Sequence, residues 1–279
     1  MNDETITLTR PSSATQTTIN PSGIKTETKY PTETIDLPSQ GYFYDSTNPL
    51  SNGQVEIKMM TAKEEDILTS TNLLKKGKAI EKLLESLVVS DVDLNTMLLG
   101  DKNALIFAAR RLAYGDSYGP LDIKCPSCQE NNKIDVDLSK LTYKDIDFSK
   151  YEKNQNSFKF TLPFSKVELE IKLIDSNDEK SIESELASIQ KLKKENSAEI
   201  TTRVKYQILS VNGDGDKQKI KAFVDNNLVS KDSLELRKFI KSITPDIDAS
   251  FDFSCTNCSH NERVAVPMTV SFFWPDSRV

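Results

Sequence analysis

The sequence has little histidine, few glycines and no long apolar run, and each shortage argues against a class of function. His260 is the only histidine among 279 residues, so a serine or cysteine nucleophile would have no second histidine as its base. No Gly-rich phosphate-binding loop occurs. No apolar stretch approaches the roughly 20 residues that span a bilayer. We therefore expect neither an enzyme nor a membrane-spanning protein.

Cysteine is also scarce, but its placement is informative. The four cysteines form two Cys-x-x-Cys pairs, Cys125 with Cys128 and Cys255 with Cys258. A gap of two residues lets both thiolates of a pair bind one ion from a tight turn, and two such turns complete a tetrahedral zinc shell. The sequence therefore predicts one structural Zn²⁺ per chain with all four cysteines as ligands. Closing this site would join the middle of the sequence to its end.

Other uses of the cysteines fit the sequence less well. Two disulfides would need an oxidising compartment, and the N-terminus does not resemble a signal peptide. A thioredoxin-like centre uses one Cys-x-x-Cys at a strand-to-helix junction, whereas here apolar and polar residues alternate around both pairs, as in strands. Each pair is therefore predicted at the tip of a β-hairpin, and the two hairpins form a composite zinc ribbon. Gln129 and Ser259 follow the second cysteines, where glycine is common because φ is often positive.

The charge balance argues against nucleic acid as a partner. The chain has 36 basic and 42 acidic residues and a net charge of −6, and an acidic chain binds nucleic acid poorly unless basic residues cluster. Near the first cysteine pair, Lys124 and Lys133 are outnumbered by the carboxylates of Asp122, Glu130, Asp135 and Asp137. A zinc-ribbon regulator that binds nucleic acid is therefore kept only as the alternative function.

The order of patterns along the chain predicts an α+β fold in four parts. Residues 1–36 are rich in threonine and poor in large apolar side chains, so we expect a disordered or extended arm. Residues 37–118 form a helical N-terminal domain. Residues 119–140 and 250–279 form the composite zinc ribbon. Residues 141–249 form an inserted domain with a β-hairpin and helices.

Capping residues and periodicity place the elements of the N-terminal domain. A strand over 55–59 precedes a helix whose start is marked by the capping-box pair Thr61 and Glu64. Gly77 ends that helix, and an apolar stripe predicts another over residues 80–88. Asp101 is expected to cap a further helix, which ends at Gly115.

The same signals extend through the rest of the chain. A hairpin is expected over residues 158–173, and a second capping box, Ser176 with Glu179, marks the start of a helix. The final predicted elements are helices over 198–210, 217–228 and 231–243, and a strand from Val264 to Trp274.

Two further groups of residues are candidates for function. His260 lies two residues after a predicted zinc ligand, where it is a fifth ligand, a general base of a zinc hydrolase, or simply exposed at the hairpin tip. Phe272, Phe273 and Trp274 form an aromatic cluster, and aromatic side chains often anchor protein interfaces. Packing of these rings in the core is the other interpretation.

Several motifs occur in an order typical of one family. They are Leu37–Tyr44, Met60–Ser70, Gly100–Leu105, Tyr114-Gly115, Cys125–Cys128, Asn212–Asp214, Leu236-Arg237, the second cysteine pair and Phe272–Pro275. From residue 37 to the C-terminus the chain thereby resembles the T4-like phage baseplate protein family, and in particular its longer members associated with the tail hub.

The resemblance implies a non-enzymatic structural or assembly protein of a contractile-tail baseplate. It implies docking on other baseplate, hub or tail proteins, and it allows a homo-oligomer that follows the tail symmetry. The protein would lie in the virion tail, and in the host cytoplasm during assembly. Family members have no known catalytic residues, so only the four cysteines carry over as functional positions.

Overall fold

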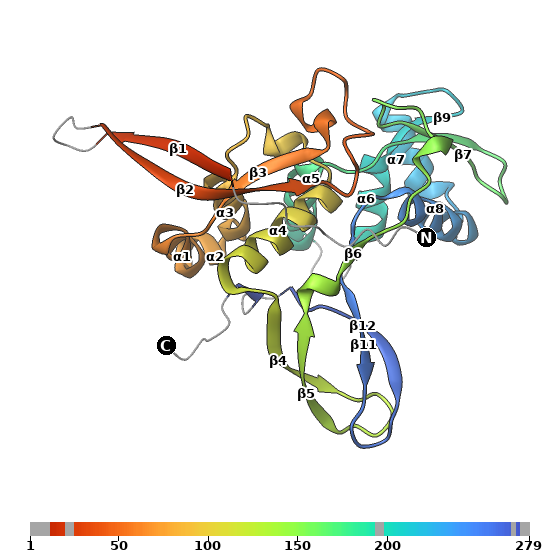
Figure 1. Cartoon of the computed structure of the whole chain (residues 1–279). Coiled ribbons are helices and arrows are strands. Elements are labelled where there is room, and N and C mark those ends of the chain that lie inside the picture. Colours follow the sequence, from red (N-terminus) through yellow and green to blue (C-terminus); the bar gives the residue numbers. More distant parts are fainter. Residues whose placement is uncertain (1–11, 20–24, 193–197, 269–271, 274–279) are drawn as a thin grey trace.

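The structure, a computed structural model, describes residues 12–19, 25–192, 198–268 and 272–273. These residues form eight α-helices and five small sheets, and all strand pairings are antiparallel. The mixed helix-and-strand composition predicted from the sequence is therefore confirmed. Figure 1 shows a body of helices and sheets from which two structures project, the β-ribbon of β1 and β2 and a pair of hairpins.

The ribbon belongs to a three-stranded sheet in the order β1-β2-β3. Its strands are β1 (Ser12–Ile19), β2 (Lys25–Asp36) and β3 (Gln54–Lys58). The last part of β2, Thr32–Asp36, pairs with β3 in the body, whereas the rest of β2 pairs with β1 in the projecting ribbon. Part of the threonine-rich segment thus forms extended strands, the second of which continues into the sheet of the body.

Four helices follow this sheet in the sequence. They are α1 (Ala62–Thr69), α2 (Thr71–Lys75), α3 (Ala79–Leu87) and α4 (Leu99–Tyr114), with single 3-10 turns η1 (Pro49–Asn52) and η2 (Leu94–Thr96). The predicted capping box is confirmed, since the backbone N–H and the hydroxyl of Thr61 both donate to Glu64 Oε2, at 2.9 and 2.6 Å. The apolar stripe of α3 faces the core through Leu83, Leu84 and Leu87.

Asp101 has a different role from the one predicted. Leu98, not Asp101, is the N-cap of α4. The Asp101 side chain is fully buried and accepts hydrogen bonds from the backbone N–H of Ser39, the hydroxyl of Ser39 and the hydroxyl of Tyr44. Loss of solvent raises the pKa of this carboxyl to about 6, although these hydrogen bonds oppose the rise. The carboxylate therefore fastens the loop before β3 to α4 instead of capping the helix.

Two hairpins carry the cysteine pairs. The first is β4 (Ser117–Lys124) with β5 (Asn131–Asp137), and the second is β11 (Ser250–Ser254) with β12 (Asn261–Ala265). They lie side by side and project together from the body (Figure 1). Strand β12 ends at Ala265, and residues 266–268 and 272–273 are not in a strand. The predicted strand from Val264 to Trp274 is therefore wrong for these residues, and its remaining positions lie outside the described residues.

The chain between the hairpins forms the inserted part. Its elements are η3 (Leu138–Lys140), β6 (Thr142–Tyr143), η4 (Phe148–Lys150), β7 (Phe158–Thr161), β8 (Glu168–Ile171), α5 (Ser176–Leu192), α6 (Glu199–Gln207), β9 (Ile208–Val211), α7 (Lys217–Asn226), α8 (Ser230–Ile243) and β10 (Ile247–Asp248). Strands β7, β8 and β9 form one sheet, and β6 pairs with β10 where the insertion enters and leaves.

Two expectations for this part are corrected. The helix predicted over 198–210 ends at Gln207, because the next four residues, β9, pair with the edge of β8, and tertiary pairing overrides local preference. The capping interaction of α5 lies one residue earlier than predicted. Asp178 N–H donates to Asp175 Oδ1 at 2.8 Å, and Asp175 N–H donates to Asp178 Oδ2 at 3.2 Å.

The main core contains a buried guanidinium, that of Arg110 on α4, which is 1% exposed. Its Nε donates to the carbonyl of Phe272 at 2.6 Å, and its two terminal nitrogens donate to the carbonyls of Gly115 and Ser117 at 3.0 Å. Burial lowers the pKa of Arg110. One side chain thus joins the end of α4, the start of the first hairpin and the segment after the second hairpin.

We predict that Arg110→Lys lowers the free energy of unfolding by about 2–3 kcal/mol, because a lysine ammonium cannot reproduce three diverging bonds and leaves buried carbonyls unpaired. Urea denaturation measures the change. Arg237→Lys is the matched control, since Arg237 is exposed on α8, and it should change stability by less than about 0.5 kcal/mol. An Arg110→Lys protein as stable as this control would contradict the role given to Arg110.

Candidate metal centre

The two cysteine turns are built alike. In the first, Cys125 N–H donates to the carbonyl of Glu130 at 2.9 Å, and in the second, Cys255 N–H donates to the carbonyl of His260 at 2.9 Å. These bonds close the turns directly beyond the last strand pairs of the two hairpins. Each Cys-x-x-Cys pair therefore lies at a hairpin tip, as the alternating flanks predicted.

The residue after each second cysteine adopts the backbone conformation that favours glycine. Gln129 has φ 63° and Ser259 has φ 57°, and the N–H of each donates to the carbonyl of the first cysteine of its pair. The absence of glycine noted in the sequence therefore does not change the turn. Gln129 and Ser259 instead adopt the left-handed backbone conformation themselves, and other contacts of the turn must offset the conformational free energy that this costs.

The four sulfurs come together between the tips. All four lie within 4.8 Å of one another. The Sγ atoms of Cys125 and Cys258 are 3.7 Å apart, and those of Cys128 and Cys255 are 3.6 Å apart. A disulfide needs a sulfur separation of about 2.05 Å, so the four cysteines are free thiols in this structure. The closest pairs join one hairpin to the other.

These distances fit a single ion. Four sulfurs at about 2.3 Å from a central Zn²⁺ in tetrahedral geometry are about 3.8 Å from one another, close to the shortest separations here. Soft thiolate ligands in this geometry suit zinc or iron. The residues present therefore fit a metal ion without any change in the course of the two turns.

The apolar contact between the hairpins is small. Cys125, Phe253 and Cys255 are buried together, apart from the main core, with five partly buried neighbours around them. A core of this size buries too little apolar surface to hold two hairpins together without a crosslink. The position of the sulfur cluster between the tips therefore fits that of a crosslink between the two hairpins.

Asn132 on β5 supports the second turn from the first hairpin. Its side chain is 3% exposed. The amide Nδ2 donates to Cys255 Sγ at 3.6 Å, and Oδ1 accepts from the backbone N–H and hydroxyl of Thr256, at 3.0 and 2.9 Å. Hydrogen bonds of this kind orient metal ligands. Sequence analysis missed this residue, and the one signal for it was a polar residue at an inward position of an alternating strand.

The thiols differ in acidity because their surroundings differ. A hydrogen bond from the backbone N–H of Cys258 lowers the pKa of Cys255 to about 6. The N–H of His260 lowers the pKa of Cys258, but loss of solvent and the sulfurs of Cys128 and Cys125 outweigh it and raise that pKa to about 11. Four thiolates at this spacing repel one another, so a cation among them is needed to ionise all four.

The other candidate residues lie outside this cluster. The imidazole of His260 lies 3.6 Å from a carboxylate oxygen of Glu262, and the sulfur cluster does not include it. Phe272 and Phe273 are 1% and 3% exposed, and the ring of Phe272 packs edge-on against Phe107, with 4.9 Å between centroids. Their burial supports the core interpretation and argues against these two rings as interface anchors. Trp274 lies outside the described residues.

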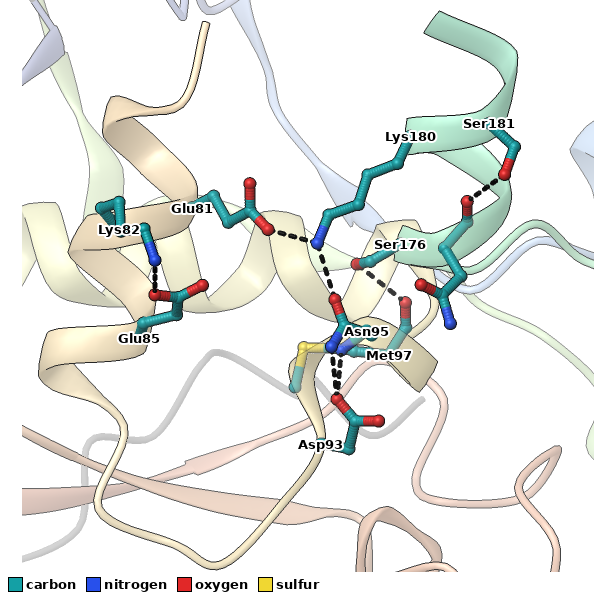
Figure 2. Close-up of polar contacts among 10 residues, drawn as sticks. Glu81, Lys82, Glu85, Asp93, Asn95, Met97, Ser176, Lys180 and Ser181 are labelled. Atoms are coloured by element: carbon teal, nitrogen blue, oxygen red, sulfur yellow. Dashed lines mark hydrogen bonds and ion pairs between the residues drawn. The ribbon is translucent and has the colours of Figure 1, made fainter. Parts of the chain in front are cut away.

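A cavity of about 250 Å³ lies where the N-terminal helices meet α5. Figure 2 shows its polar contacts: Lys180 binds the carboxylate of Glu81 and donates to Asn95 Oδ1 at 2.6 Å, and the hydroxyl of Ser176 donates to the carbonyl of Met97. These bonds fasten the inserted part to the N-terminal helices. A larger cavity of about 620 Å³ lies between α5, α6, α7 and β9, and its wall includes Lys205 of α6, two lysines of α7 and Lys172, which follows β8.

The comparisons with known proteins assign a family. The family model described as T4 bacteriophage base plate protein matches residues 15–274, nearly the whole chain. No curated protein and no solved structure matches the chain. Among the described residues, no helix is both long and apolar enough to cross a membrane. The match covers both cysteine pairs and all the described elements from β2 onward, and the chain therefore belongs to the T4 bacteriophage base plate protein family.

Proposed function

We propose that this protein is a non-enzymatic structural or assembly component of a contractile-tail baseplate, associated with the hub. The observation that carries the proposal is the family match over residues 15–274. The sulfur cluster adds support, because four cysteine ligands form a closed metal shell without the open position that catalytic zinc keeps for water or substrate.

The metal is Zn²⁺, bound by Cys125, Cys128, Cys255 and Cys258 as thiolates, with one ion per chain. Zinc accepts four thiolates in tetrahedral geometry and has no redox chemistry of its own. When bound, it holds the tips of the two hairpins together and neutralises part of their charge. The protein supplies the two turns and the Asn132 hydrogen bond that keep the sulfurs in place.

The partners are other baseplate, hub or tail proteins, and the location is the virion tail, reached from the host cytoplasm during assembly. Nucleic acid is not proposed as a partner, because carboxylates outnumber lysines around the first cysteine turn. Docking on these partners needs a fixed shape, and the two hairpins, which zinc would link, project from the body (Figure 1).

We predict one equivalent of zinc per chain in protein purified under reducing conditions, and a roughly 100-fold loss of zinc affinity in Cys255→Ser, because a serine hydroxyl does not replace a thiolate ligand. Metal analysis and competition with a chromogenic chelator measure these quantities.

The control for this change is Ser254→Ala. Ser254 is exposed and adjacent to Cys255 but contributes no sulfur, so its variant should keep the full zinc content. Wild-type protein that holds no metal under reducing conditions, or Cys255→Ser protein that keeps zinc as tightly as the control, would refute the proposed zinc site.

We predict that the protein is present in the tail fraction of purified virions or in tail-assembly intermediates, and that Cys255→Ser reduces its incorporation at least tenfold while Ser254→Ala does not. Quantitative mass spectrometry of both fractions measures this. Absence of the protein from both virions and tail-assembly intermediates would rule out the baseplate function, whatever the metal content of the protein.

A further inference from the structure

The sheet that carries the ribbon has two edges, and they differ. At the β3 edge, Val88 forms a β-bridge with Ile57, the N–H of Val89 donates to the carbonyl of Glu56, and the hydroxyl of Ser90 accepts from the N–H of Glu56. The segment after α3 therefore covers this edge. At the other edge, β1 pairs with β2 on one side, and no other strand of the described chain pairs with it.

This edge, which no other strand of the described residues covers, lacks the usual protection against pairing. Natural edge strands are commonly short, charged, interrupted by proline or twisted away by bulges. Strand β1 is eight residues long, its sequence SSATQTTI has no charged residue and no proline, and its pairing with β2 is regular throughout. Three threonines and one isoleucine also favour extended structure. By contrast, β2, which is paired over its length, carries lysine, glutamate and aspartate.

The ribbon also has little support of its own. Residues 25–31 of β2 pair with β1 alone, and only Thr32–Asp36 pair with β3. The ribbon projects from the body instead of lying on it (Figure 1). An isolated two-stranded ribbon is marginally stable in water, and a third strand adds backbone hydrogen bonds along its whole length.

We propose that β1 pairs antiparallel with the β1 strand of a second copy of this chain, which joins two three-stranded sheets into one. The composition of β1 favours a second copy of this strand as its pairing partner. An uncharged strand meets its own copy without like-charge repulsion, and threonine pairs across antiparallel strands are favourable. Antiparallel pairing of a strand with itself also gives a closed two-fold interface. The inference depends on neither the zinc site nor the baseplate role.

The register of the ribbon identifies the positions for the test. Gln16 and Thr18 lie opposite Thr28 and Thr26 of β2, so charges placed there meet no charged residue within the ribbon. Thr17, by contrast, lies opposite Glu27 and is avoided. Two variants of the full-length chain follow: Gln16→Lys with Thr18→Lys, and Gln16→Glu with Thr18→Glu. Each puts like charges across the proposed pairing.

Analytical ultracentrifugation measures the outcome. Wild-type protein at micromolar concentration should sediment with about twice the 31.4 kDa chain mass. Each double variant should dissociate with a constant raised at least tenfold, and an equimolar mixture of the two should form the mixed dimer, because opposite charges then face each other. Ala187→Lys with Gln190→Lys adds the same charge to exposed positions of α5 and should leave the dimer intact.

Three results would overturn the proposal. The first is a wild-type protein that stays monomeric at high micromolar concentration. The second is a dimer whose dissociation constant neither double variant changes. The third is a pair of monomeric variants that do not associate when mixed, since this would mean that the substitutions disturbed the ribbon and not a pairing between copies.

Discussion

The meeting of two cysteine turns from distant parts of the sequence is the contact on which the architecture depends. The sulfurs of Cys125 and Cys258 lie 3.7 Å apart, although the two residues are 133 positions apart in the sequence. Bringing the ends of so long a segment together costs conformational entropy, and the small apolar cluster beside the sulfurs contributes little against that cost. A metal ion bound by four thiolates, as proposed above, would add free energy at the hairpin tips, because metal binding would then be coupled to the closing of the tips.

Two further contacts, both within the body, also join the chain before the insertion to the chain after it. At the base of the insertion, Tyr143 pairs with Ile247 across β6 and β10. Arg110 then binds the carbonyl of Phe272, so the segment after the second hairpin returns to the helix that precedes the first. The hairpins are therefore fixed at their bases by backbone and guanidinium hydrogen bonds and at their tips by sulfur. Loss of the metal would free the tips first, while the bases keep the two hairpins near one another.

Sequence patterns predicted several local interactions correctly, although they placed the capping pair of α5 one residue too late. The spacing of the cysteines, the Thr61–Glu64 capping box and the apolar face of α3 each involve residues within one or two turns of chain. The sequence patterns failed where contacts between distant parts of the chain determine the role of a residue. Asp101 has the sequence features of a helix cap, but its carboxylate binds Ser39 and Tyr44. Gly100, the first residue of a family motif, also depends on a distant contact. A Cβ at this position would lie 1.7 Å from the carbonyl oxygen of Pro245, so only glycine fits. Nothing near Gly100 in the sequence reveals that contact.

The central claim is that one zinc ion bound by four cysteine sulfurs joins the two hairpins. X-ray absorption spectroscopy of the full-length chain at the zinc edge tests it most directly, because the first coordination shell reports the ligand atoms themselves. The account predicts four sulfur atoms at about 2.3 Å and no nitrogen or oxygen in that shell. A shell that contains nitrogen or oxygen, or fewer than four sulfurs, would contradict it.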